Sequence, residues 1–131
     1  MIGIVLASHG RLAEGMIDSC RLFFGDDIPQ LAAVSLNPGD SPEQFRDLLL
    51  EALDKVNEGD GVIVMADLFG GTPCNVATLS LPEDVQLISG MNLPILLELL
   101  GLRLGNDTID IEQLVSVGKD GLRLVDKIKR G

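Results

Sequence analysis

Four short apolar segments, each followed by a stretch of different character, most constrain the fold of this chain. They cover residues 2–7, 31–36, 62–66 and 85–88, and they are apolar almost throughout instead of alternating with polar residues. Strands of this kind are buried on both faces, and helical crossovers between them imply a parallel sheet. The sequence therefore predicts a three-layer, doubly wound α/β fold with a mostly parallel sheet, for which we expect the strand order 2-1-3-4.

Helix signals lie between the first three of these strands. An apolar stripe at helical spacing runs from Leu12 through Met16 and Cys20 to Phe23, which predicts a helix. The clearest helix start is the segment at residues 41–44, Ser-Pro-Glu-Gln. Its serine is the expected N-cap, its proline suits the first helical position, and its glutamine can complete a capping box.

The second half of the chain is read in the same way. Thr72 is the expected cap of a helix that follows the third strand, and another helix is expected from Asn92 to Leu100. Residues 110–117 are expected to form a helix. Residues 122–125 are expected to form a short strand.

Composition limits the classes of function. The chain has 131 residues, of which 46% are apolar, so residues 1–131 are expected to form a single domain. The formal net charge is −10, which leaves no basic face for nucleic acid or an anionic membrane. The first apolar run is too short for a signal peptide, and no run can span a bilayer. We therefore expect a cytoplasmic protein whose cysteines, Cys20 and Cys74, are buried or bystander thiols.

The only histidine, His9, is the first candidate for chemistry. It ends the first predicted strand, and ligand sites of such sheets lie beyond the carboxyl ends of the strands. Gly10 leaves room for a bulky ligand, and the N–H groups that begin the next helix suit a phosphate. A lone histidine is more often structural or a bystander, but this position favours a nucleophile.

Asp67 is the second candidate, because it follows the third predicted strand as His9 follows the first. In the order 2-1-3-4 these strands are neighbours, so the two side chains are expected to meet. A carboxylate that accepts from one ring nitrogen fixes the tautomer and leaves the other nitrogen free to attack. The alternative is that Asp67 only caps its loop. Met91 and Asn92 follow the fourth strand and are expected to line the same rim.

Three further residues join Gly10 as candidates for binding phosphate. Gly71 and Thr72 belong to a Gly-Gly-Thr-Pro segment that can form an anion nest and begin a helix. Arg11 could neutralise phosphate or meet a partner protein. The alternatives are an ordinary strand-to-helix turn and a solvated arginine. The sequence contains neither a Walker loop nor a dinucleotide fingerprint, and no ligand cluster is evident, so neither a cofactor nor a metal is predicted.

Three segments together carry a family resemblance. They are residues 6–15 (LASHGRLAEG), 65–75 (MADLFGGTPCN) and 90–94 (GMNLP). Over roughly residues 2–100 the chain resembles the enzyme IIA component of the mannose family of bacterial sugar phosphotransferase systems (PTS). Residues 101–120 match that family little.

The resemblance implies a specific function. The histidine matching His9 is phosphorylated on Nε2 by the phosphocarrier protein HPr and donates to a histidine of enzyme IIB, and the sugar is phosphorylated later. The aspartate matching Asp67 accepts from Nδ1–H, and the residue matching Thr72 lies near the phosphate. The family fold is a parallel α/β sheet. Family members are homodimers, and in some a C-terminal strand, here matching residues 122–125, is exchanged between subunits.

Four alternatives remain. Histidine phosphatases and phosphoglycerate mutases use Arg-His-Gly and a second histidine, whereas this chain has Ser8 before its only histidine. Metal chelatases of the sirohydrochlorin or cobalt type need further ligands. A regulatory interaction domain has no need to keep both His9 and Asp67. The phosphocarrier subunit of a dihydroxyacetone kinase is nearer, and the Asp-Leu-Phe-Gly-Gly-Thr-Pro segment favours the sugar-transport branch over it.

Overall fold

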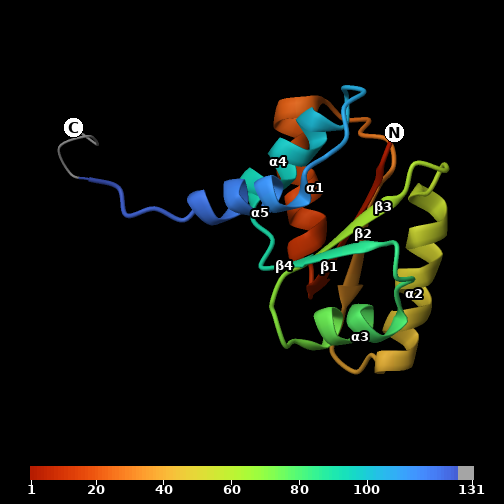
Figure 1. Cartoon of the computed structure of the whole chain (residues 1–131). Helices are drawn as coiled ribbons and strands as arrows, with labels where there is room; N and C mark the ends of the chain where they lie inside the picture. The colour runs from red at the N-terminus through yellow and green to blue at the C-terminus, as the bar shows by residue number, and fades with distance from the viewer. Residues whose placement is uncertain (127–131) are drawn as a thin grey trace. The chain divides into compact units, whose positions relative to one another are not determined.

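The computed structural model of the chain describes residues 1–126, in which a four-stranded sheet is accompanied by five helices (Figure 1). In chain order the elements are β1 (Gly3–His9), α1 (Leu12–Phe24), β2 (Leu31–Leu36), α2 (Pro42–Val56), β3 (Val62–Ala66), α3 (Thr72–Ser80), β4 (Gln86–Ser89), α4 (Leu93–Leu102) and α5 (Ile111–Asp120). The chain divides into two compact units, Met1–Met91 and Asn92–Gly131. A single domain over residues 1–131 stays a prediction.

All four strands of the sheet are parallel, in the order β2-β1-β3-β4. This confirms the predicted fold class and strand order. β1 is central, with Ala7 opposite Ala66 of β3 and His9 opposite Leu36 of β2. The carboxyl ends of β1 and β3 therefore meet at one edge of the sheet. Asp67 directly follows β3 at that edge.

Helices cover both faces of the sheet within the first unit. Side chains of α2 and α3 share a buried core with one face of β1 and β3, formed by Val5, Phe45, Leu49, Val64, Ala77 and their neighbours. α1 packs against β1 and β2 from the other side, as Figure 1 shows. Strands apolar on both faces require this arrangement, because either face would otherwise expose its side chains to water.

The N-terminus of α2 begins as its sequence signals predict, whereas that of α3 does not. Ser41 Oγ accepts from the N–H of Gln44 (3.1 Å), and the Gln44 side chain accepts from the N–H of Ser41 (2.9 Å), which confirms the capping box of α2. The prediction that Thr72 caps α3 is wrong by one residue. Gly71 is the N-cap and Thr72 is already helical, because the loop turns one residue earlier than expected.

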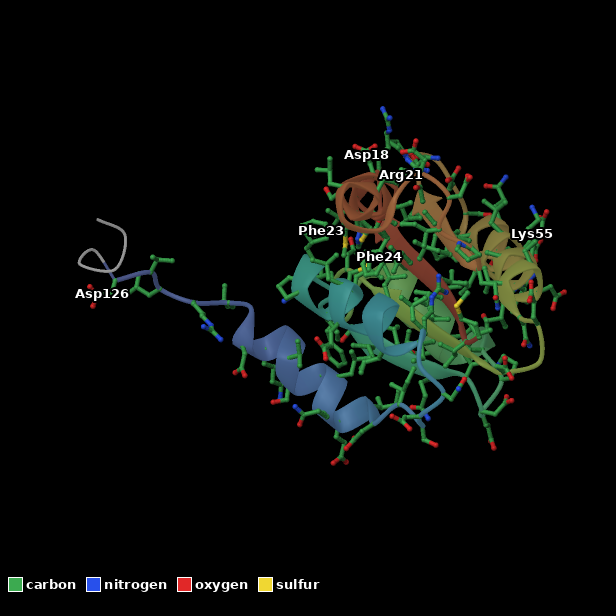
Figure 2. All side chains as sticks on the ribbon, turned by 90° about the horizontal axis from the view of Figure 1, so that it is seen from above. Asp18, Arg21, Phe23, Phe24, Lys55 and Asp126 are labelled. Carbon is green, nitrogen blue, oxygen red and sulfur yellow. The ribbon has the colours of Figure 1, made fainter. Side chains whose placement is uncertain are left out.

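The apolar stripe of α1 is also rotated from its predicted position. Ala13, Met16 and Cys20 are buried, whereas Leu12 is 52% exposed and Phe23 is 62% exposed. Figure 2 shows Phe23 and Phe24 at the end of this helix. The buried face follows the small side chain of Ala13, which lies close to β1, and the bulkier residues at both ends flank it.

The second unit consists of two helices and their connections. α4 and α5 pack on each other, and the Asn92 side chain accepts from the N–H of Ile95 (3.1 Å) and donates to the carbonyl of Gly118 (2.7 Å). The predicted helices are confirmed, and α5 runs three residues beyond its predicted end. Residues 122–125 form no strand, since no strand within residues 1–126 pairs with them, and Leu122 and Leu124 are exposed. No helix within residues 1–126 is long and apolar enough to cross a membrane.

Candidate active site

His9 and Asp67 meet at the carboxyl edge of the sheet, as the strand order predicts. Nδ1 of His9 lies 2.9 Å from Oδ2 of Asp67. The same carboxylate oxygen accepts the backbone N–H of His9 (2.9 Å), and the N–H of Asp67 donates to the carbonyl of Ala7 (3.1 Å). Backbone and side chain together therefore fix the position of the imidazole relative to β3.

This geometry determines which ring nitrogen is free. An ionised carboxylate can only accept, so Nδ1 of His9 carries the proton and Nε2 keeps its lone pair. The Asp67 side chain is 10% exposed, whereas that of His9 is 46% exposed, so the ring extends from a buried anchor towards solvent. Such an arrangement makes a nucleophile of Nε2.

The second oxygen of Asp67 has no partner. Its Oδ1 is buried and lacks a hydrogen-bond donor anywhere within residues 1–126. A buried carboxylate that is little solvated attracts a neighbouring cation more strongly than one in water. Asp67 is thus suited to stabilise the positive charge that the ring gains when Nε2 bonds to an electrophile.

The amide groups of the two predicted phosphate-binding glycines are already engaged. The N–H of Gly10 donates to the carbonyl of Leu36 (2.8 Å), and that of Gly71 donates to the carbonyl of Leu68 (3.2 Å). Their roles in binding phosphate stay predictions. Gly10 does adopt the left-handed conformation (φ 55°) that glycine tolerates, and it opens onto free space.

Gly71 instead lies against the catalytic candidate itself. A methyl group at the Cβ position of residue 71 would lie 2.6 Å from Cε1 and 3.2 Å from Nε2 of His9. Thr72 follows as the first residue of α3, and its N–H has no acceptor within the described chain. The N-terminus of α3 therefore begins beside the imidazole and offers a donor there.

Arg11 is the N-cap residue of α1, and its side chain pairs with Glu14. Its Nε is 3.4 Å from Oε2 of Glu14, which in turn accepts from the Ser35 hydroxyl (3.4 Å), and the arginine side chain is exposed. No hydrogen bond or ion pair joins its side chain to His9 within the described residues. Arg11 is near the site in sequence, and its role in binding phosphate stays a prediction.

Sequence reasoning missed Ser8, which is buried directly before His9. Its hydroxyl donates to the carbonyl of Gly10 (3.1 Å) and accepts the N–H of Ala13 (2.8 Å). Arg11, the residue at the N-cap of α1, makes no side-chain cap, so Ser8 supplies it from outside the helix. The sequence signal that could have indicated this role is a polar residue near the end of an otherwise apolar strand.

Met91 and Asn92, which were expected to line the rim, make contacts elsewhere. Met91 is buried and its N–H donates to the carbonyl of Ala66 (3.0 Å), while Asn92 caps α4. Neither is a free side chain at the rim. Cys20 and Cys74 are buried free thiols, as predicted, and burial raises the pKa of Cys20. The described residues contain no group of three or more histidines, cysteines and carboxylates that could hold a metal ion.

The chain is similar to a known protein family over most of its length. The family model described as the PTS system fructose IIA component (EIIA-man) matches residues 3–115. The chain is 34% identical over 105 residues to the PTS system fructose-specific EIIA component of Bacillus subtilis (strain 168), covering 79% of this chain and 71% of that protein.

Two further relatives extend the match. The chain is 27% identical over 126 residues to the PTS system mannose-specific EIIAB component of Escherichia coli (strain K12), covering 93% of this chain but only 39% of that protein. The crystal structure of the PTS IIA protein associated with the fucose utilization operon from Streptococcus pneumoniae superposes with a TM-score of 0.80 at 30% identity, covering 98% of this chain and 93% of that one.

Proposed function

Because this chain belongs to the EIIA-man family of PTS IIA components, we propose that His9 carries a phosphoryl group between two proteins of a sugar phosphotransferase system. The phosphate donor is phospho-HPr and the acceptor is a histidine of enzyme IIB. The single observation that carries the proposal is the 2.9 Å bond between Nδ1 of His9 and Asp67, which leaves Nε2 as the free nucleophile.

The reaction is an in-line displacement at phosphorus. The lone pair of His9 Nε2 forms the new N–P bond while the N–P bond to the donor imidazole breaks, and the donor nitrogen keeps that electron pair. The His9 ring, still protonated on Nδ1, becomes cationic, and the Asp67 carboxylate stabilises it. The second step is the same displacement in the opposite role, with enzyme IIB as nucleophile. Transfer between two imidazoles needs little driving force.

Backbone donors bind the phosphate oxygens in this proposal. The N–H of Thr72 at the start of α3 and that of Leu12 at the start of α1 both lack an acceptor within residues 1–126. Donors fixed before the reaction stabilise the charge that spreads over the transferring group. Gly10 leaves room for it, and Arg11, once it exchanges its exposed bond with Glu14, adds a positive charge.

The proposal includes partners and an assembly. We place the carrier in the cytoplasm, where successive docking of HPr and enzyme IIB on one exposed edge suits a half-exposed histidine. We also propose a homodimer in which residues 122–125 of one copy pair with a free sheet edge of the other. The exposed Leu122 and Leu124 support this, since an unpaired apolar segment gains from burial. The fructose- and mannose-specific names of the relatives favour sugar transport over a dihydroxyacetone kinase.

Phosphotransfer in a purified system tests the function. The chain is incubated with enzyme I, HPr and labelled phosphoenolpyruvate, and label is expected on the wild-type chain. His9→Ala is the test variant, and Arg46→Ala, an exposed change on α2, is the matched control. Label that persists in His9→Ala, or that is absent from wild type, would contradict the assignment.

A further inference from the structure

The backbone of Gly71 forms the surface against which the His9 imidazole lies. The 2.6 Å separation from a Cβ at residue 71 to Cε1 is shorter than any normal carbon–carbon contact, so a side chain there would force the ring to move. The 3.2 Å separation to Nε2 places the same side chain beside the nucleophilic nitrogen.

The imidazole of His9 cannot move away from residue 71 without a change in its hydrogen bonds. Its Nδ1 is held at 2.9 Å by Oδ2 of Asp67, and that oxygen also holds the backbone N–H of the same histidine. A rotation that relieves the contact with residue 71 therefore lengthens or breaks the bond to Asp67. It also releases the tautomer that this bond fixes.

We propose that Gly71 is a positioning residue for His9, because its missing side chain lets the imidazole stay bound to Asp67 with Nε2 open to a phosphoryl group. The effect of Gly71 on phosphoryl transfer rests on the proposed function, whereas its contact with the His9 ring does not. This role is distinct from the predicted phosphate-binding role of Gly71, which stays a prediction because its N–H donates to the carbonyl of Leu68.

Backbone conformation gives no other reason for glycine at this position. Gly71 has φ −78° and ψ 165°, an extended conformation that any residue adopts, whereas Gly70 has φ 83°. A Gly71→Ala variant is thus unstrained in its own backbone. Any effect it has on the site must arise from the contact with His9.

The first test reads the ring directly. Because His9 is the only histidine, its imidazole nitrogens give one pair of NMR signals. In the wild type we expect the Nδ1–H tautomer, and in Gly71→Ala a shift towards the Nε2–H form with phosphorylation by phospho-HPr slowed about tenfold or more. Gly15→Ala is the matched control, since a Cβ there meets nothing within 4 Å on the exposed face of α1, and it is expected to keep both properties.

The second test asks whether the effect depends on the histidine. Gly71→Ala is expected to lower the urea midpoint more in the wild-type chain than in a His9→Ala background, where only the loss of a glycine N-cap remains. An unaltered tautomer and rate in Gly71→Ala, or an equal midpoint shift with and without His9, would overturn the inference. If the wild-type chain is not phosphorylated at all, the proposed function fails, while the tautomer and the urea comparison still decide the role of Gly71.

Discussion

Replacing Asp67 by asparagine removes the negative charge at the site while keeping its shape. The amide oxygen can still accept both bonds from His9, but its NH₂ group then occupies the place of Oδ1, which is buried and has no hydrogen-bond partner within residues 1–126. A hydrogen bond to a charged group contributes about 1.5–3 kcal/mol and a neutral one about 0.5–1.5, so the imidazolium loses roughly 1–1.5 kcal/mol of stabilisation. That difference corresponds to about tenfold in rate.

Rapid-quench measurement of transfer from phospho-HPr checks this value. We expect Asp67→Asn to be phosphorylated about tenfold more slowly than wild type, with labelling still detectable. The matched control is Asp54→Asn on the exposed side of α2, which removes one charge from the same chain at a distance from the site. A rate equal to that of the control would remove Asp67 from the mechanism. Complete loss of labelling would mean that the carboxylate does more than stabilise charge.

Other perturbations test the fold around the site. Ser8→Ala leaves the buried N–H of Ala13 unpaired and is expected to lower the free energy of unfolding by about 1–3 kcal/mol in urea titration, and no loss would contradict the capping role. Ser41→Ala removes half of a capping box and should cost about 1 kcal/mol in the same assay. Since burial raises the pKa of Cys20 in the folded state, the unfolded chain loses that proton first. The free energy of unfolding should therefore fall as pH rises past the ordinary thiol pKa of 9.0. In an alkylation assay at pH 8, the Cys20 thiol of the folded chain should stay unmodified until urea is added. Leu124→Asp should turn the proposed dimer into a monomer in sedimentation, and an unchanged mass would rule out pairing through residues 122–125.

The sequence by itself determined the sheet and the pairing at its edge. Short apolar runs without alternation indicate strands buried on both faces, and the helical crossovers between them make those strands parallel. Once the order is 2-1-3-4, residues that end the first and third strands must be neighbours, which is why His9 and Asp67 could be paired beforehand. The capping box of α2 could be predicted in the same way, because its residues lie within four consecutive positions.

Only the tertiary structure decided how the groups around His9 are used. Whether the N–H of Gly10 or Gly71 is free depends on carbonyls of Leu36 and Leu68, and Leu36 is brought near by strand pairing, not by sequence proximity. The contact of Gly71 with the imidazole has the same origin, since 62 positions of chain separate them and only the packed loop brings them together. Periodicity and local motifs report interactions over a few residues, whereas close packing between distant segments determines which atoms remain free.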